Sequence, residues 1–468
     1  KRGPAGLAIL WSTLVVAASL YLAVGFAGPE VFKVTESSRD FPLTVSSAED
    51  APDAIWTGRL YSMQKLHQII YLEAQILRPR NMTTNTEFSY QQEIVISMEG
   101  GGIMSHGRGT TLIDAKRHLK TVTCKAGEEF CSKMSLIATH DVLYPEYHVT
   151  VKFIHPGELS LYCPHCPNGG ERFDFSVHFS MNYINPEFTK WQIGWKFTFA
   201  VITLLVMFLP LSGGRLELFS GYFWQLRKTK RENWSDQQIW VATLLAMLFL
   251  FNDPLFLVEI YSDYGAMMSA VYIAFLCAFL ATLMFFWLCV FHETSLVGSR
   301  SETDESAIAK GIGFYLFKAI YCTFLWLLMT SSYIYLRVQS EGDPSYDALE
   351  DSTHYKLIAG ANNIATAIYL GWITYHGLNA LGNVKKLPGP VVFVFSFSVL
   401  MIILVIVCVA IGATYPLPSA SYEFLLFYGL TNTYVWCLSF AYAPLSASST
   451  SLTESSSMVE IGPLAASV

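Results

Sequence analysis

The stretch that decides the fold is residues 267–291, MMSAVYIAFLCAFLATLMFFWLCVF, which holds 25 residues and no charged side chain. A hydrocarbon core about 30 Å thick needs about 20 residues of helix at a rise of about 1.5 Å per residue. An uncharged apolar run of this length is therefore typical of a transmembrane helix.

The same pattern recurs along the chain. One apolar run, Gly6–Phe26, lies near the N-terminus, and seven lie after residue 190, separated by short polar connections. Those seven runs are Trp191–Leu211, Ile239–Ile260, Met267–Phe291, Ile312–Leu336, Leu357–Tyr375, Val391–Ala413 and Phe424–Ala443. They predict a multi-pass membrane protein with a seven-helix bundle that contacts membrane lipids.

The composition agrees with a membrane protein. Of the 468 residues, 52% are hydrophobic and only 14% are charged, whereas soluble domains carry about 25% charged residues. The net charge of -7 argues against a nucleic-acid partner, because binding to phosphate backbones needs a basic surface.

The first run has two possible roles. Lys1 and Arg2 precede it, and a basic flank before an apolar core is also typical of a signal peptide. The run is longer than the usual signal core of about 7–15 residues. We therefore expect residues 1–26 to form an N-terminal transmembrane anchor, with a cleaved signal peptide as the alternative. The chain starts without Met, which leaves residues before Lys1 open.

Residues 27–190 are polar and strand-like. Apolar and polar residues alternate in Tyr147–Phe153 and in Phe173–Met181, which places one face of each strand on a core. Glycines such as Gly100–Gly102 indicate turns. We predict a β-sandwich domain over 27–190, followed by the bundle over 191–443 and a disordered, Ser-rich tail over 444–468.

The orientation follows from the positive charges, because Lys and Arg favour the cytosolic side of a membrane. With a cytosolic N-terminus, eleven such residues fall in cytosolic segments: Lys1, Arg2, Arg215, Arg227, Lys228, Lys230, Arg231, Arg300, Lys310, Lys385 and Lys386. The short loops on the other side hold two, Arg337 and Lys356. Both termini are therefore predicted to be cytosolic, and residues 27–190 lumenal or extracellular.

Four cysteines lie in the polar domain: Cys124, Cys131, Cys163 and Cys166. An oxidising compartment favours disulfides, and we expect the pairs Cys124–Cys131 and Cys163–Cys166 among three possible connectivities. The alternatives are a redox motif at Cys163-Pro164-His165-Cys166 and a metal site. A redox motif normally opens a helix, and a zinc ribbon needs a second pair of matching spacing, so neither is favoured.

Two sequences fit the pattern for N-glycosylation. Asn81-Met82-Thr83 lies in the predicted lumenal domain and is expected to carry a glycan. Asn233-Trp234-Ser235 lies on the predicted cytosolic side and is expected to stay bare.

The main polar feature within the spans is Asn252-Asp253-Pro254. The uninterrupted run before it, Ile239–Phe251, is 13 residues, about 20 Å of helix and too short to cross the membrane. Proline removes a backbone donor, and a carboxylate in lipid is costly. We expect the helix to kink or end here near the lumenal mouth, with Asp253 turned from lipid and the freed carbonyl met by a neighbouring helix, the β-domain or water. The motif is either a structural kink or a ligand- or ion-facing site.

Asn362 and Asn363 form a second polar cluster within the spans. Hydrogen bonding between helices is the plain interpretation, and a polar site is the alternative. The spans show no paired carboxylates, metal cluster or activated nucleophile, so we expect neither an enzyme nor a cofactor or metal.

Several blocks of the sequence resemble the transmembrane protein 181 family. They are Val24–Pro29, Asn185–Phe188, Phe249–Phe256, Phe286–His292, Glu423–Leu430 and Phe440–Pro444, together with the cysteine pair that follows Thr121-Val122-Thr123. They occur in the family's order over most of the chain. The Cys163–Cys166 pair and the short tail depart from the family pattern.

That family resembles the wider group in which a Golgi-dynamics (GOLD) domain precedes seven helices and which includes the Wnt carrier Wntless. The resemblance implies a lumenal β-sandwich on a bundle with a lipid-accessible cavity. It also implies trafficking, or binding of a secreted or lipidated cargo, in Golgi, endosome or plasma membrane.

Two further functions stay open: an orphan signalling receptor similar to G-protein-coupled receptors, and an accessory subunit of a larger membrane complex. The third core helix ends Val290-Phe291-His292-Glu293 without an Asp/Glu-Arg-Tyr triplet, and no proline follows Asn432. Both observations argue against a rhodopsin-like receptor.

Overall fold

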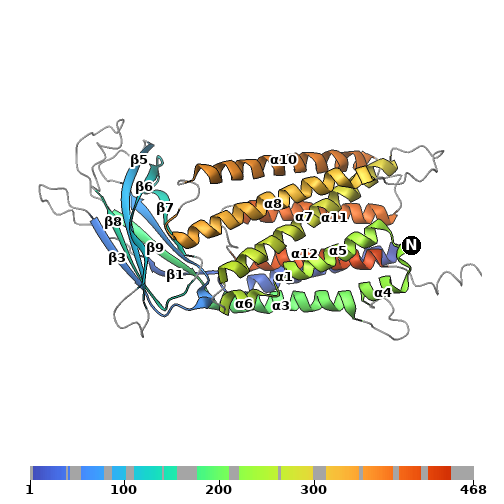
Figure 1. The fold of residues 1–468 in the computed structure, drawn as a ribbon, viewed down its shortest axis with the longest axis horizontal. Helices are drawn as coiled ribbons and strands as arrows, with labels where there is room; N and C mark the ends of the chain where they lie inside the picture. Colours follow the sequence, from blue (N-terminus) through green and yellow to red (C-terminus); the bar gives the residue numbers. More distant parts are fainter. Residues whose placement is uncertain are drawn as a thin grey trace, which may run out of the picture.

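The computed structural model shows a β-domain at one end of a long helical bundle (Figure 1). The structure describes residues 4–37, 41–42, 54–78, 87–101, 110–139, 142–154, 176–209, 221–261, 265–298, 312–346, 352–382, 389–412 and 420–443. The first helix lies within the bundle, the strands follow it, and the chain then returns to the bundle for its remaining helices.

The β-domain consists of two antiparallel sheets. The first has the strand order β1–β9–β4–β7, with β2 also paired to β9, and the second has the order β3–β8–β5–β6. The strands are β1 (Phe32–Ser37), β2 (Phe41–Pro42), β3 (Ala54–Leu60), β4 (Ile70–Leu77), β5 (Phe88–Gly101), β6 (Thr110–Cys124), β7 (Phe130–Thr139), β8 (Glu146–Phe153) and β9 (Ser176–Ile184). The predicted β-sandwich architecture is confirmed.

The alternation read from the sequence sets the core between the sheets. In β8, every second residue from Tyr147 to Phe153 is buried, as a strand with one face on a core requires. Trp56 of the second sheet stacks on Phe179 of the first, with ring centroids 4.1 Å apart. Gly100, expected in a turn, instead lies inside β5. A side chain there would meet the ring of Tyr144, so the glycine gives space to an aromatic ring.

The helices are α1 (Pro4–Phe26), α3 (Pro186–Phe208), α4 (Tyr222–Lys228), α5 (Asp236–Phe251), α6 (Phe256–Tyr261), α7 (Gly265–Gly298), α8 (Ile312–Gly342), α10 (Thr353–Gly382), α11 (Gly389–Gly412) and α12 (Ser421–Tyr442). Among the described residues, six helical segments are long and apolar enough to cross a membrane, and α11 has a shorter apolar stretch. α10, with 30 residues, is long enough to cross a membrane, but its sequence is less apolar.

α3 begins earlier than the apolar run that predicted it. The Asn185 side chain caps the helix by accepting a hydrogen bond from the amide of Glu187 at 3.1 Å, and Pro186 occupies the first turn. Both residues favour a helix start. The β-domain therefore passes into the bundle through β9 and a capped helix without a linker.

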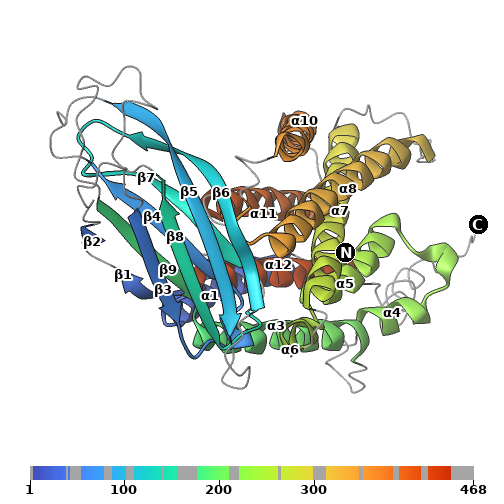
Figure 2. The ribbon, with the colours of Figure 1, turned by 60° about the vertical axis from the view of Figure 1, so that its left-hand side comes forward.

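The N-terminal helix is part of the bundle. α1 packs along α12 and also contacts α11, and the two views agree on this placement (Figures 1 and 2). Close approach depends on glycine: a side chain at Gly25 would meet the backbone of Tyr422. The Tyr21 hydroxyl also lies 3.0 Å from Thr433 Oγ1 of α12. In contrast, α10 packs on α7 and α8 and stands towards the edge of the bundle (Figure 2).

Candidate functional site

The second core span is broken where Asn252-Asp253-Pro254 predicted a kink or an end. α5 ends at Phe251, and α6 starts at Phe256, whose amide donates to the Asp253 carbonyl at 3.2 Å. Asp253 has a φ of 53°, a left-handed conformation that costs energy for a residue with a side chain and is further disfavoured before proline. Such strain persists only where the surrounding structure holds it.

We expected a neighbouring helix, the β-domain or water to meet the carbonyl that Pro254 leaves free, but within the described residues its partner is closer in the chain. Leu250 O instead accepts the amide of Asp253 at 3.0 Å. The left-handed turn of Asp253 thus closes the end of α5 with the chain's own backbone, as αL residues do at many helix ends.

The Asp253 carboxylate pairs with Lys196 of α3. Lys196 Nζ donates to Asp253 Oδ2 at 2.8 Å, and the two side chains are 4% and 2% exposed. Removing two charges from water costs several kcal/mol per ion, so a buried pair is kept only with good geometry. Charged groups within a membrane bundle face its interior and mark functional sites by default.

Aromatic rings surround the same ammonium group. Lys196 Nζ lies 3.7 Å from the ring centroid of Phe256, 4.6 Å from that of Tyr272 and 6.0 Å from that of Tyr428. The hydroxyls of Tyr272 and Tyr428 hydrogen-bond to each other. Ring faces attract cations at such distances, so Asp253 and the three rings form an ammonium cage built from the helix break, α6, α7 and α12.

A cluster of neutral amides lies next to this cage. Asn252 Nδ2 donates to Asn432 Oδ1 at 2.7 Å, and Asn432 Nδ2 donates back to Asn252 Oδ1 at 2.8 Å. Thr203 of α3 and Trp436 of α12 extend the cluster, since Trp436 Nε1 donates to Thr203 Oγ1 at 3.2 Å. Asn252, Thr203 and Asn432 are completely buried. The amides hold α3, α5 and α12 together at the level of the break.

The β-domain meets the bundle beside this site through a short 3-10 turn, Lys65–His67. Thr189 Oγ1 of α3 donates to the Leu66 carbonyl at 2.7 Å, and Gln68 Nε2 donates to Thr189 Oγ1 at 2.7 Å. Lys65 Nζ lies 3.5 Å from the carbonyl of Tyr261, the last residue of α6. α6 therefore joins the ammonium cage at one end to the β-domain at the other.

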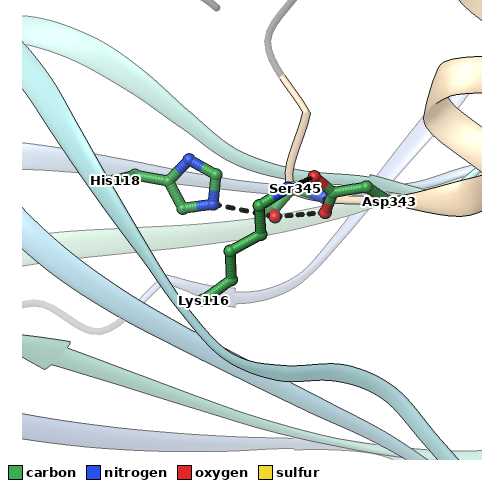
Figure 3. A network of polar contacts seen from close by, with 4 residues as sticks. All are labelled: Lys116, His118, Asp343 and Ser345. Atoms are coloured by element: carbon green, nitrogen blue, oxygen red, sulfur yellow. Dashed lines mark hydrogen bonds and ion pairs between the residues drawn. The ribbon is translucent and has the colours of Figure 1, made fainter.

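A second contact joins β6 to the segment that follows α8 (Figure 3). Lys116 of β6 forms an ion pair with Asp343, and His118 Nε2 lies 2.9 Å from Ser345 Oγ. The Ser345 hydroxyl and amide both donate to Asp343 Oδ1. Because that hydroxyl hydrogen points to the carboxylate, His118 Nε2 is the donor to Ser345 Oγ. We call these four residues the clasp.

The clasp continues into the backbone of the sheet. The Ala138 amide of the edge strand β7 donates to the Pro344 carbonyl at 2.8 Å, so the segment covers part of that edge. Burial by itself raises the pKa of Asp343, but hydrogen bonds from Lys116 and Ser345 outweigh it and hold the pKa below its ordinary value. The charged form of Asp343 therefore stabilises the attachment.

Asn362 and Asn363 do not join the site. Both lie on α10, which packs on α7 and α8. Asn363 is exposed, and the buried Asn362 Oδ1 has no hydrogen-bond partner among the described residues.

The other sequence-predicted residues lie in the β-domain. Cys124 and Cys131 form a disulfide between β6 and β7. Cys163, Cys166 and Asn81, like the tail over 444–468, lie outside the described residues. Within the described part of the chain, no group of three or more His, Cys, Asp or Glu side chains has an arrangement suited to a metal ion.

Sequence reasoning missed two central residues. Lys196 is a lone lysine inside the apolar run Trp191–Leu211, and Asn432 is a lone amide inside Phe424–Ala443. A single polar residue deep within a predicted span is the signal that could have found both, because such residues face the bundle interior and seek partners.

Comparisons with known proteins agree with this architecture. Residues 185–446 match the family model described as "Wntless-like, transmembrane domain". The chain is also 26% identical over 444 residues to "Transmembrane protein 181" of Homo sapiens, an alignment that covers 91% of this chain and 82% of that protein. The matched region starts at Asn185, the cap of α3, and contains both the ammonium cage and the amide cluster.

Proposed function

This chain belongs to the family of proteins with a Wntless-like transmembrane domain, and from that membership we propose that it is a non-enzymatic receptor that binds a cargo or ligand on the lumenal side of secretory and endosomal membranes. The ligand is a lumenal protein or a lipidated cargo. In this proposal the β-domain and the lumenal mouth of the bundle form one binding unit.

The observation that carries the proposal is the contact between the β-domain and α6, the helix that follows the break at Asn252–Pro254. The turn Lys65–His67 contacts α3 and α6, and α6 begins three residues after the strained Asp253. A ligand that shifts the β-domain would move α6 and with it the buried Lys196–Asp253 pair. A strained residue and a buried ion pair at a joint between two units are typical of sites with two arrangements.

The proposed orientation rests on the positive charges. Eleven Lys and Arg residues fall in the segments on one side of the spans, and the short loops on the other side hold two, which favours cytosolic termini and a lumenal β-domain. The Cys124–Cys131 disulfide suits an oxidising lumen. Golgi, endosome and plasma membrane all meet these conditions, and a glycan on Asn81 with none on Asn233 would support the orientation.

Two readouts together test the cargo function. A photo-crosslinking amino acid at Leu119, an exposed residue of β6, should capture lumenal cargo, whereas the same probe at Lys230, exposed beside α4, should not. Mass spectrometry of the culture medium then compares cells with and without the protein. A secreted protein that is both captured at Leu119 and lost from the medium supports a carrier. Normal secretion of every captured protein would contradict it.

A signalling receptor is the second candidate. The amide cluster ties α3, α5 and α12 together beneath the β-domain, so movement of α6 could reach the far ends of these helices. This alternative predicts that a captured ligand activates a G protein in reconstituted membranes while secretion stays unchanged. A third outcome, stable co-purification with other membrane subunits in mild detergent, would favour the accessory-subunit function.

A further inference from the structure

The ammonium cage does not depend on the lysine that fills it. Tyr272 and Tyr428 bind each other through their hydroxyls. Asp253 is fixed by the backbone bonds that close α5 and open α6, and Phe256 is the first residue of α6. The negative and π-rich groups are therefore placed by their own elements, and only the occupant arrives from elsewhere.

The occupant is a flexible side chain of a different helix. Lys196 projects from α3 and places its Nζ between the Asp253 carboxylate and the face of Phe256, at 2.8 Å and 3.7 Å. A carboxylate with aromatic faces around one point is the chemistry by which proteins recognise organic ammonium groups.

The position of the cage within the fold is also that of a ligand site. Asp253, Phe256 and Tyr428 are each less than a tenth exposed, so a bound cation is shielded from water and its interactions are strengthened. The cage lies next to α6, whose other end contacts the β-domain. It also contains the left-handed Asp253, and strained residues cluster at ligand clamps.

We propose that Asp253, Phe256, Tyr272 and Tyr428 form a binding site for a primary ammonium group, occupied in this structure by the chain's own Lys196. A free amine and the ethanolamine headgroup of a lipid carry the same group, and either competes with Lys196 when α3 and α6 separate. The site goes beyond cargo binding, because it gives the bundle a ligand chemistry of its own.

Chemical rescue in purified full-length protein tests this site. Lys196→Ala empties the cage and leaves Asp253 buried without its partner, so the variant unfolds at a lower temperature. Ethylammonium chloride should raise its Tm to a saturating value, whereas sodium chloride of equal ionic strength and ethanol should not. Wild type should show a smaller rise that needs a higher amine concentration, because the amine must first displace Lys196. Lys190→Ala, altered at an exposed position of the same helix, should behave as the wild type.

The double variant Lys196→Ala/Asp253→Asn separates the site from general amine effects. Without the carboxylate, ethylammonium should lose its effect. An equal rise in the single and double variants, or none in the single variant, overturns the proposal. If Lys196→Ala can be purified only with ethylammonium present, the site is supported. If the double variant can be purified but Lys196→Ala cannot be purified even with ethylammonium present, the proposal is overturned.

Lipid nanodiscs identify the source of the ammonium group. A higher Tm of Lys196→Ala in phosphatidylethanolamine than in phosphatidylglycerol supports a lipid headgroup, and rescue by ethylammonium with equal Tm in both lipids supports a soluble amine. No cargo is present in these experiments. Their failure would therefore leave the proposed receptor function standing, and loss of the receptor function would leave the cage intact.

Discussion

Neutralising one member of the Lys196–Asp253 pair should destabilise the bundle far more than neutralising both. The two side chains are 4% and 2% exposed and 2.8 Å apart. Removing one leaves the other as an uncompensated buried charge, which typically costs about 3–5 kcal/mol, whereas replacing both partners with neutral groups of similar volume is close to neutral. We therefore expect Lys196→Met and Asp253→Asn each to lose about 3–5 kcal/mol, and the double variant to recover most of this loss.

The substitutions are chosen so that shape changes little. Met is unbranched like Lys and one heavy atom shorter, and Asn tolerates the left-handed backbone that Asp253 adopts. Lys190→Met is the matched control, because Lys190 lies on the same helix in an exposed ion pair with Glu187, 57% and 65% exposed. Pairs of that kind contribute about 0–1 kcal/mol.

The assay is unfolding of the purified variants in one detergent, followed by tryptophan fluorescence, with stability compared in a double-mutant cycle. The coupling energy between Lys196 and Asp253 should be at least about 3 kcal/mol. Single variants within about 1 kcal/mol of wild type, or a double variant as unstable as the two losses added, would refute the buried pair.

Three further predictions concern the rest of the molecule. Gly25→Ala should cost about 1–3 kcal/mol, because the methyl group meets the backbone of α12, whereas Gly371→Ala, with nothing within 4 Å, should not lower Tm. Cys124→Ser, which breaks the disulfide, should lower the stability of the β-domain by about 2–4 kcal/mol, measured by urea unfolding; unchanged stability would contradict this. The pKa of Asp343 lies below its ordinary value, so its stabilising charge is fully present above the unfolded carboxyl pKa of about 3.9 and is lost as pH falls through the folded value. Protection of the Ala138 amide from hydrogen exchange should therefore persist at about pH 5 and fail only in stronger acid, and loss of protection near pH 6 would rule out control by this carboxylate.

Local sequence patterns were sufficient to predict the helices and strands and their order along the chain. Uncharged runs such as Met267–Phe291 give helices because the bilayer leaves backbone groups no other partner. Alternation over Tyr147–Phe153 gives a strand because one face must be buried. Pro254 gives a helix break because it has no amide hydrogen. Each of these effects acts within a few residues, so it can be read without knowing any neighbour in space.

The partners of the polar residues were decided only by the tertiary structure. Lys196 and Asp253 are 57 residues apart, and Asn252 and Asn432 are 180 apart. The sequence shows that such side chains must turn from lipid, but many buried partners would satisfy that demand equally. Which partner each side chain contacts depends on how the helices pack and rotate, and the packing is set by side-chain shapes across the whole bundle.

The contacts of the clasp were likewise decided only by the tertiary structure. The charge of Asp343 is visible in the sequence, but no local pattern identifies its partner. Lys116 lies 227 residues away on β6, and the two meet because the β-domain is seated on the bundle at a particular angle. That angle depends on two contacts together, the turn Lys65–His67 against α3 and α6 and the clasp, so it cannot be predicted from any single segment of the sequence.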